Sequence, residues 1–267
     1  MTDIPSQATS VPSRLGTTAR FEDGELLLDL EPRAELLHHG IIRASVLSFS
    51  IDAVAGITVD GDESVWTLTT DMTVRMRPVP APGRVTATNT ILRRGKRSVT
   101  SVVEVVADDG SHVATGAIGF VNIPRGPDAP PKPVVPPSQA PRLFHNQHPI
   151  TRPLRDEAGI EVIDPAEGIV QVEITPDLQN PAGTLQGAMV ALVAEAATED
   201  LVATRFESPV VVTDLDLRYL AQTQAGPVRT RCRLLGTGPD ASVQVELIDT
   251  STGRITTLVY ARATPVA

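Results

Sequence analysis

The stretch from Gly187 to Ala203, which reads GAMVALVAEAATEDLVA, decides the fold. It is apolar on nearly every side, it is longer than a typical strand, and its alanines favour a helix. A helix that is apolar all round must be buried. Because one helix cannot bury itself, the stretch predicts a sheet wrapped around it.

The segments around this helix are typical of strands. Gly168 to Thr175 alternates apolar and polar residues, which is the period of a half-buried strand. The loop Pro176 to Gln186, with Asn180-Pro181 and Gly183 as turn residues, then leads into the helix. After the helix, apolar runs separated by Gly, Pro and Asp predict further strands, which are Val210 to Ala221, Val228 to Gly236, Ser242 to Asp249 and Ile255 to Ala263.

The first half of the chain repeats this order. Thr70-Asp71-Met72-Thr73-Val74-Arg75 resembles Thr213-Asp214-Leu215-Asp216-Leu217-Arg218 at an offset of 213 − 70 = 143, and several glycines recur at the same offset. An apolar helix is predicted at Ile41 to Ile57. The predicted strands are Leu26 to Leu30, Val65 to Arg77, Arg84 to Arg93, Ser98 to Ala107 and Val113 to Val121. The sequence therefore predicts a tandem duplication.

A proline-dense segment separates the two halves. Because proline fixes φ and lacks a backbone donor, residues 124–153 are expected to form an extended spacer. The segment 1–19, rich in Ser, Thr and Pro, is expected to be a flexible N-terminus. The predicted domain plan is therefore a first unit at 20–123 and a second unit at 154–267.

Composition limits the function classes. Aromatic residues make up 3% and the net charge is −9, and both argue against a nucleic-acid partner. The single cysteine, Cys232, permits no intramolecular disulfide, which fits a reducing compartment. No signal peptide and no membrane span are recognisable. A cytoplasmic protein without a membrane partner is the expectation.

The loop before the second helix carries a motif. Asn180-Pro181-Ala182-Gly183-Thr184-Leu185-Gln186-Gly187-Ala188 resembles the pattern Asn-x-x-Gly-x-x-His-Gly-Gly of hotdog thioesterases of the phenylacetate-pathway and 4-hydroxybenzoyl-CoA types. Gln186 replaces the His and Ala188 replaces the last Gly, and the equivalent loop of the first half keeps only Gly40. The resemblance implies an α+β double hotdog, with both helices on the concave side of one continuous antiparallel sheet.

The resemblance also points to two carboxylates. In that family a helical Asp or Glu follows nine residues after the motif His. Here 186 + 9 gives Glu195, and the equivalent of Gln186 is Arg43 (186 − 143), so that 43 + 9 gives Asp52. Both lie in apolar sequence, where an unpaired carboxylate is costly to bury and where a raised pKa suits base or nucleophile chemistry. The structural alternative is that each lies on an exposed stripe of its helix or bonds a neighbouring Ser or Thr.

The resemblance implies two sites, each formed between the units. Site one would join Asn180, Gln186 and Gly187 to Asp52, with Asp52 as general base or nucleophile. Gly187, at a helix N-terminus, lets a thioester carbonyl approach free N–H groups closely, and Gln186 would orient the carbonyl or a water.

Site two would join Arg43, Ala44 and Ser45 to Glu195. It keeps less of the motif, so site one is favoured. Glu195 remains a candidate catalytic residue.

The strongest basic cluster of this acidic chain is Arg93-Arg94-Gly95-Lys96-Arg97, at a predicted hairpin turn. In similar proteins this region meets CoA phosphates, which makes Arg94, Lys96 and Arg97 the candidate CoA-binding residues. The alternative is a solvated hairpin tip. CoA enters as part of the substrate, and no separate cofactor or metal site is expected, because the sequence shows no metal-ligand cluster and no nucleotide-binding fingerprint.

The leading hypothesis is an acyl-CoA thioesterase. The sequence leaves open whether the acyl group is carried by CoA or by a carrier protein. The runner-up is a non-catalytic acyl-CoA or small apolar ligand-binding protein on the same scaffold, since the motif His is missing. A structural module without a pocket and a hotdog dehydratase rank lower. Because tandem hotdogs resemble half of a hotdog tetramer, a homodimer is expected.

Overall fold

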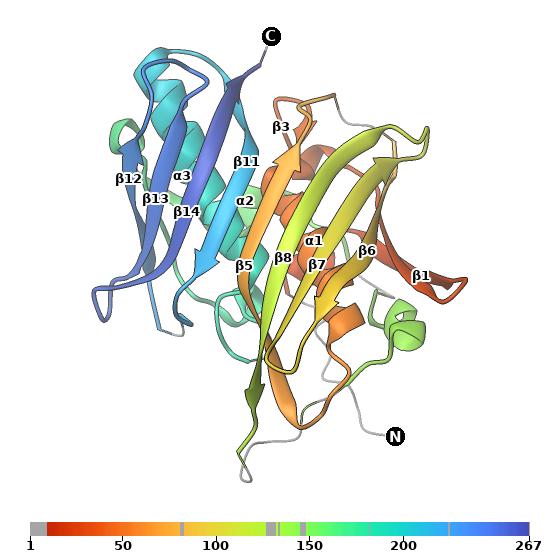
Figure 1. Cartoon of the computed structure of the whole chain (residues 1–267). Helices are drawn as coiled ribbons and strands as arrows, with labels where there is room; N and C mark the ends of the chain where they lie inside the picture. The colour runs from red at the N-terminus through yellow and green to blue at the C-terminus, as the bar shows by residue number, and fades with distance from the viewer. Residues whose placement is uncertain are drawn as a thin grey trace.

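The computed structural model describes residues 10–80, 83–126, 132, 134–144, 148–180, 182–223 and 225–266. One twelve-stranded antiparallel sheet curves around two long helices that lie on the same side of it (Figure 1). The long helices are α1 (Ala44–Val59) and α3 (Gly187–Phe206), and they pack against each other.

The strand order runs as one series with an internal symmetry. In the first half it is β2 (Glu25–Leu30), β6 (Val85–Arg94), β7 (Ser98–Ala107), β8 (His112–Pro124) and β5 (Val65–Met76). In the second half the same order reads inward from the opposite edge as β10 (Ile169–Val172), β12 (Val228–Leu234), β13 (Ser242–Asp249), β14 (Arg254–Pro265) and β11 (Val210–Tyr219). Two edge strands complete the sheet: β1 (Thr17–Glu22) pairs with β2, and β9 (Glu161–Asp164) pairs with β10. The continuous sheet is therefore confirmed.

The two halves meet at the β5–β11 pair. There Arg75 lies opposite Asp214 and Asp71 lies opposite Arg218, so each half presents the same Asp and Arg to the other. These are the residues of the repeated Thr-Asp segment, at 71 + 143 and 75 + 143. A self-complementary pairing of this kind is what a two-fold arrangement of two similar surfaces produces.

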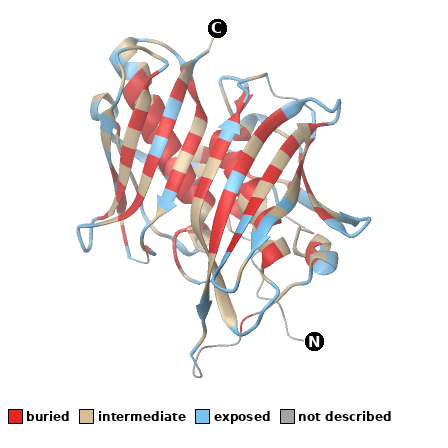
Figure 2. Ribbon diagram, in the orientation of Figure 1, coloured by how far each residue is buried: buried red, intermediate tan, exposed pale blue. Residues whose placement is uncertain are grey.

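Both helices are buried by the half of the sheet to which they belong. α1 packs on β2 and β5 to β8, and α3 packs on β10 to β14. Figure 2 shows the alternation of buried and exposed residues along the strands, with the buried set facing the helices. The core is built from Val, Leu, Ile and Ala, as the low aromatic content requires.

Several boundaries differ from the expectations. The first long helix begins at Ala44 and not at Ile41, because β4 (Ile41–Ile42) pairs with β3 (Leu37–His38). A short 3-10 helix η2 (Ala34–Leu36) precedes that pair, and α2 (Leu154–Glu157), η4 (Pro165–Glu167) and η5 (Pro176–Leu178) lie in the connections of the second half.

The terminal and linking segments are more ordered than expected. Residues 1–9 of the predicted flexible segment lie outside the described residues. From residue 10 the prediction is wrong, because Val11 and Leu15 are buried in the core around η1 (Pro12–Arg14), and β1 starts at Thr17.

The extended-spacer prediction is also wrong in part. Residues 127–131, 133 and 145–147 lie outside the described residues, but η3 (Pro137–Phe144) is a 3-10 helix packed on β1, β2 and α1. Lys132 also binds into the body of the protein, where its Nζ donates to the Asp60 carboxylate and to the Val65 carbonyl. Among the described helices, none has both the length and the apolar character that crossing a membrane requires.

Candidate active site

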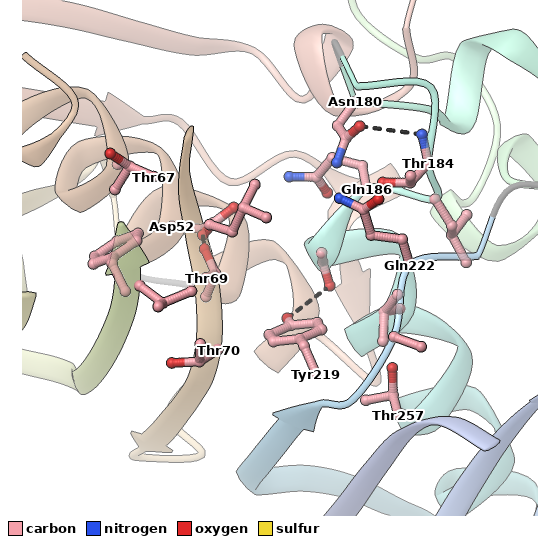
Figure 3. Close-up of a pocket in the computed structure, with 18 of the residues that line it drawn as sticks. Asp52, Thr67, Thr69, Thr70, Asn180, Thr184, Gln186, Tyr219, Gln222 and Thr257 are labelled. Atoms are coloured by element: carbon pink, nitrogen blue, oxygen red, sulfur yellow. Dashed lines mark hydrogen bonds between the residues drawn. The ribbon is translucent and has the colours of Figure 1, made fainter. Parts of the chain in front are cut away.

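A pocket of about 490 Å³ lies between the two halves of the chain (Figure 3). The first half contributes side chains of α1, β5 and β8. The second half contributes the loop 180–186, the first turn of α3 and the segment that follows β11. Asp52, Asn180, Gln186 and Gly187 all line this pocket, so the structure brings together the four residues that the sequence assigned to site one.

Asp52 lies in the middle of α1 and faces the N-terminus of α3. Its Oδ2 is 3.7 Å from the position that a Cβ on Gly187 would occupy, and its Oδ1 accepts a hydrogen bond of 2.9 Å from the Thr69 hydroxyl of β5. What remains of its exposed surface opens onto the pocket. Burial raises the pKa of the Asp52 carboxyl above its ordinary value, and the hydrogen bond from Thr69 opposes that rise.

The N-terminus of α3 is capped by Gln186. Its Oε1 accepts from the backbone N–H of Ala188 at 2.6 Å and of Met189 at 3.3 Å. Within the described residues the N–H of Gly187 has no acceptor. The helix therefore presents one unpaired donor, at a partially positive helix end, toward the pocket.

This geometry narrows the predicted role of Gln186. Its side-chain oxygen is used as a helix cap, so only its amide nitrogen remains for a ligand. Asn180 shapes the preceding loop in a similar way, because its Oδ1 accepts from the N–H of Ala182 and of Thr184. Figure 3 shows the amides of Asn180, Gln186 and Gln222 gathered on the α3 side of the pocket, across from Asp52 and Thr69. Their roles toward a substrate stay predictions.

Tyr219 is a pocket residue that the sequence did not reveal. It ends β11, and its hydroxyl donates to the Gly187 carbonyl at 3.2 Å. Burial raises the pKa of the Tyr219 phenol well above its ordinary value, and the Asp52 carboxylate adds to the rise. The equivalent position of the first half is Met76 (219 − 143), so this hydroxyl has no counterpart there. That break in the repeat was the available signal.

The predicted site two is assembled but filled by its own side chains. The Glu195 carboxylate accepts from the Ala44 N–H at 2.7 Å and from the Ser45 hydroxyl at 2.5 Å. Glu195 thus occupies the N-terminus of α1, where the mirror site would receive a substrate. Arg43 turns to Glu199, to which its Nη1 donates at 2.9 and 3.1 Å. Glu195 is therefore a buried structural partner in this structure and not a group that faces a pocket ligand.

The charges of this second cluster are closely packed. Burial raises the pKa of Glu199 to about 8; the Arg43 guanidinium opposes this shift and the neighbouring Glu195 carboxylate adds to it. Burial, together with the charges of Arg43, lowers the pKa of His38 to about 3, so His38 is neutral near pH 7. Arg155 pairs with Asp200 at 2.6 Å.

The basic hairpin lies near one end of the pocket. Arg94, Lys96 and Arg97 are exposed at the β6–β7 turn, and Arg94 donates to the Val59 carbonyl at the C-terminus of α1. The carbonyls of Lys96 and Arg97 accept from Asn122, which is paired with the pocket residue Thr67. None of the three basic side chains lines the pocket itself. Their role in binding CoA phosphates stays a prediction.

No family model matches the chain, and no curated protein matches it in sequence. Solved structures are similar to it in fold. An acyl-ACP thioesterase from Bacteroides thetaiotaomicron is similar with a TM-score of 0.62 at 11% identity, over 89% of this chain and 97% of that one. The tesB protein of Mycobacterium avium subspecies paratuberculosis is similar with a TM-score of 0.60 at 13% identity, over 90% of this chain and 93% of that one.

A protein of unknown function with a hot dog fold from Alicyclobacillus acidocaldarius is similar with a TM-score of 0.59 at 13% identity, over 97% of this chain and 99% of that one. These likenesses extend over nearly the whole chain on both sides. They show that the chain has the hotdog fold, as the resemblance implied.

Proposed function

We propose that the protein hydrolyses an acyl-CoA thioester to a free acid and CoA at site one. The observation that carries the proposal is the position of the Asp52 carboxylate, whose Oδ2 lies 3.7 Å from where a Cβ on Gly187 would be, across the boundary between the two halves. A base beside an oxyanion donor is the minimum that acyl transfer to water requires. The thioesterase neighbours of the same fold support the reaction type.

In the proposed reaction the thioester carbonyl oxygen lies on the Gly187 N–H. Asp52 takes a proton from a water as that water attacks the carbonyl carbon. The carbon–sulfur bond then breaks, and the leaving sulfur takes this proton from Asp52, which releases the free acid and the CoA thiol. If Asp52 itself attacks the carbon, the carbon–sulfur bond breaks to leave an acyl–Asp52 anhydride, and a water then hydrolyses the anhydride, gives its proton to the thiolate and frees the carboxylate. Thr69 holds one carboxylate oxygen, so that the other faces the substrate. Tyr219 fixes the first turn of α3 through the Gly187 carbonyl, which keeps the N–H donor directed at the pocket.

CoA is proposed as the carrier because the basic hairpin lies beside the Thr67 end of the pocket. A pantetheine arm in the pocket would bring the CoA phosphates out near Arg94, Lys96 and Arg97, in a chain that is otherwise acidic. The proposal includes a cytoplasmic enzyme built from the units 20–123 and 154–267. It also includes a homodimer of the chain, which light scattering of the purified protein tests.

The test is release of free thiol from a panel of acyl-CoAs by the wild type and by Asp52→Asn. The substitution keeps the shape of the side chain and removes the base, so kcat is expected to fall by about 100-fold or more. Asp109→Asn, in an exposed turn remote from the pocket, is the matched control and is expected to keep full activity. Equal turnover by Asp52→Asn would refute the assignment of Asp52.

The same experiment separates the runner-up. If no acyl-CoA is cleaved while the esters still raise the melting temperature, the chain is an acyl-CoA-binding protein on a hotdog scaffold, and the hydrolase proposal is wrong.

A further inference from the structure

The end of the pocket beyond Tyr219 is lined by hydroxyl and amide groups. Thr184 precedes α3, Gln222 and Thr223 follow β11, and Thr257 lies on β14 beside Tyr219. Figure 3 shows Gln222 and Thr257 on the far side of Tyr219 from Thr67 and Asp52. We call Thr184, Gln222, Thr223 and Thr257 the far end of the pocket.

The three threonines of the far end are almost fully buried as residues. Thr184, Thr223 and Thr257 are only 3%, 5% and 2% exposed. Within the part of the chain that the structure describes, none of their hydroxyls has a hydrogen-bond partner, but their oxygens are still accessible, and all three residues line the pocket.

Other buried threonines of the same half are satisfied. The hydroxyls of Thr198, Thr230 and Thr256 donate to main-chain carbonyls at 2.8, 2.7 and 3.2 Å. Accessible hydroxyls that have no protein partner and line a cavity bond whatever fills it, which is either water or a polar group of a ligand.

If the proposed function holds, the layout of the pocket indicates that the acyl group of the substrate lies at these hydroxyls. The basic hairpin lies at the Thr67 end, and Asp52 and Gly187 lie in the middle. If the CoA phosphates emerge at the hairpin and the thioester lies at Gly187, then the acyl group points into the far end. Val190 and Leu185 also line the pocket, and its volume of about 490 Å³ limits the size of the acyl group that fits beside a pantetheine arm.

We infer that the substrate is a thioester of a compact acyl group that carries its own oxygen function, such as a hydroxy or oxo acid, which pairs with the Thr257 hydroxyl and its neighbours in the far end. A saturated acyl group of the same length would displace water from these hydroxyls and leave them without partners. Sites built to bond a substrate hydroxyl discriminate against the analogue that lacks it.

The experiment compares thioesters matched in length. The ratio of kcat/KM for 3-hydroxybutyryl-CoA over butyryl-CoA is measured for the wild type, Thr257→Val and Thr256→Val, with palmitoyl-CoA as the long-chain arm. The wild-type ratio is expected to be about tenfold or more, and Thr257→Val, which keeps the shape of the side chain, should bring it close to one. Thr256→Val is the control, because Thr256 is equally buried on the same strand but bonds the Leu247 carbonyl outside the pocket.

The outcomes distinguish this inference from the proposed function. A wild type that cleaves butyryl-CoA or palmitoyl-CoA as well as the hydroxylated ester overturns the inference and leaves the hydrolase intact. A ratio that Thr257→Val does not change also overturns it. If nothing is cleaved, the proposed function fails, and the fluorescence of the single tryptophan, Trp66, next to Thr67, then ranks the binding of the same two esters. Equal binding would refute the far end as an oxygen-recognising subsite.

Discussion

Replacing Gly187 with alanine tests the centre of the site with one methyl group. Gly187 is the first residue of α3 and does not have a positive φ, so alanine fits its backbone. The new Cβ would lie 3.1 Å from the Tyr219 hydroxyl and 3.7 Å from Asp52 Oδ2. The methyl group therefore fills the gap between base and helix N-terminus that the thioester carbonyl needs.

The cost to stability should be small. Tyr219 must yield by a few tenths of an ångström, and alanine recovers about 0.5–1 kcal/mol of the backbone entropy that glycine loses in a helix. The melting temperature should change by no more than about 2–4 °C. Activity should fall by about 100-fold, since a displacement of about 1 Å at the reacting atoms has that effect.

Calorimetry and thiol release on the same preparations measure both quantities. Gly61→Ala is the control, because a Cβ on this exposed loop residue has no neighbour within 4 Å. A Gly187→Ala variant that folds and cleaves like the wild type would refute the placement of the thioester at this helix end. A variant that fails to fold would refute the stability argument.

The ionisable groups and the basic hairpin give three more predictions. Asp52→Asn should raise the melting temperature at pH 7 but not at pH 3, because a carboxyl with a raised pKa destabilises the fold progressively as pH rises above its ordinary value of 3.8. With the pKa of Glu199 raised from 4.5 to about 8, the free energy of unfolding should decrease as pH rises through that interval, and urea titrations of Glu199→Gln should show a flatter pH profile. Joint replacement of Arg94, Lys96 and Arg97 by alanine should raise KM with little change in kcat and should weaken the salt dependence of kcat/KM, measured between about 0.01 and 0.15 M salt.

Periodicity located the regular elements closely where one face is buried. β7 and β13 lie within the predicted residues, since each alternates without interruption. β1 was missed although the sequence carries a signal for it, which is the pair Asp23-Gly24. Both residues have positive φ in the turn from β1 to β2, as a tight Asp-Gly hairpin requires. The start of α1 was misplaced because an apolar pair such as Ile41–Ile42 fits a short strand as well as a helix.

For the candidate site, local sequence patterns predicted some residues, whereas others depend on the tertiary structure. The motif and the helical offset located Gln186, Gly187 and Asp52 because both are local patterns, and the resemblance to hotdog thioesterases implied that these residues meet. Thr69 and Tyr219 reach the pocket only through the pairing of strands distant in the sequence, and neither belongs to a motif. The state of site two was equally hidden, because its residues satisfy the pattern and only their hydrogen bonds reveal that Glu195 fills it.

The difference between the two pseudo-sites reduces to a few atoms at equivalent positions. Glutamate is one methylene longer than aspartate, and Glu195 reaches the N–H of Ala44 at 2.7 Å, whereas Asp52 leaves the N–H of Gly187 unpaired within the described residues. Ala44 already carries the methyl group whose absence at Gly187 opens site one. An anion at a helix N-terminus is stabilising, and in site two the protein supplies that group itself through Glu195. In site one the equivalent N–H is left without a protein partner within the described residues, beside a carboxylate that Thr69 alone bonds there, and the proposed function places the substrate at this position.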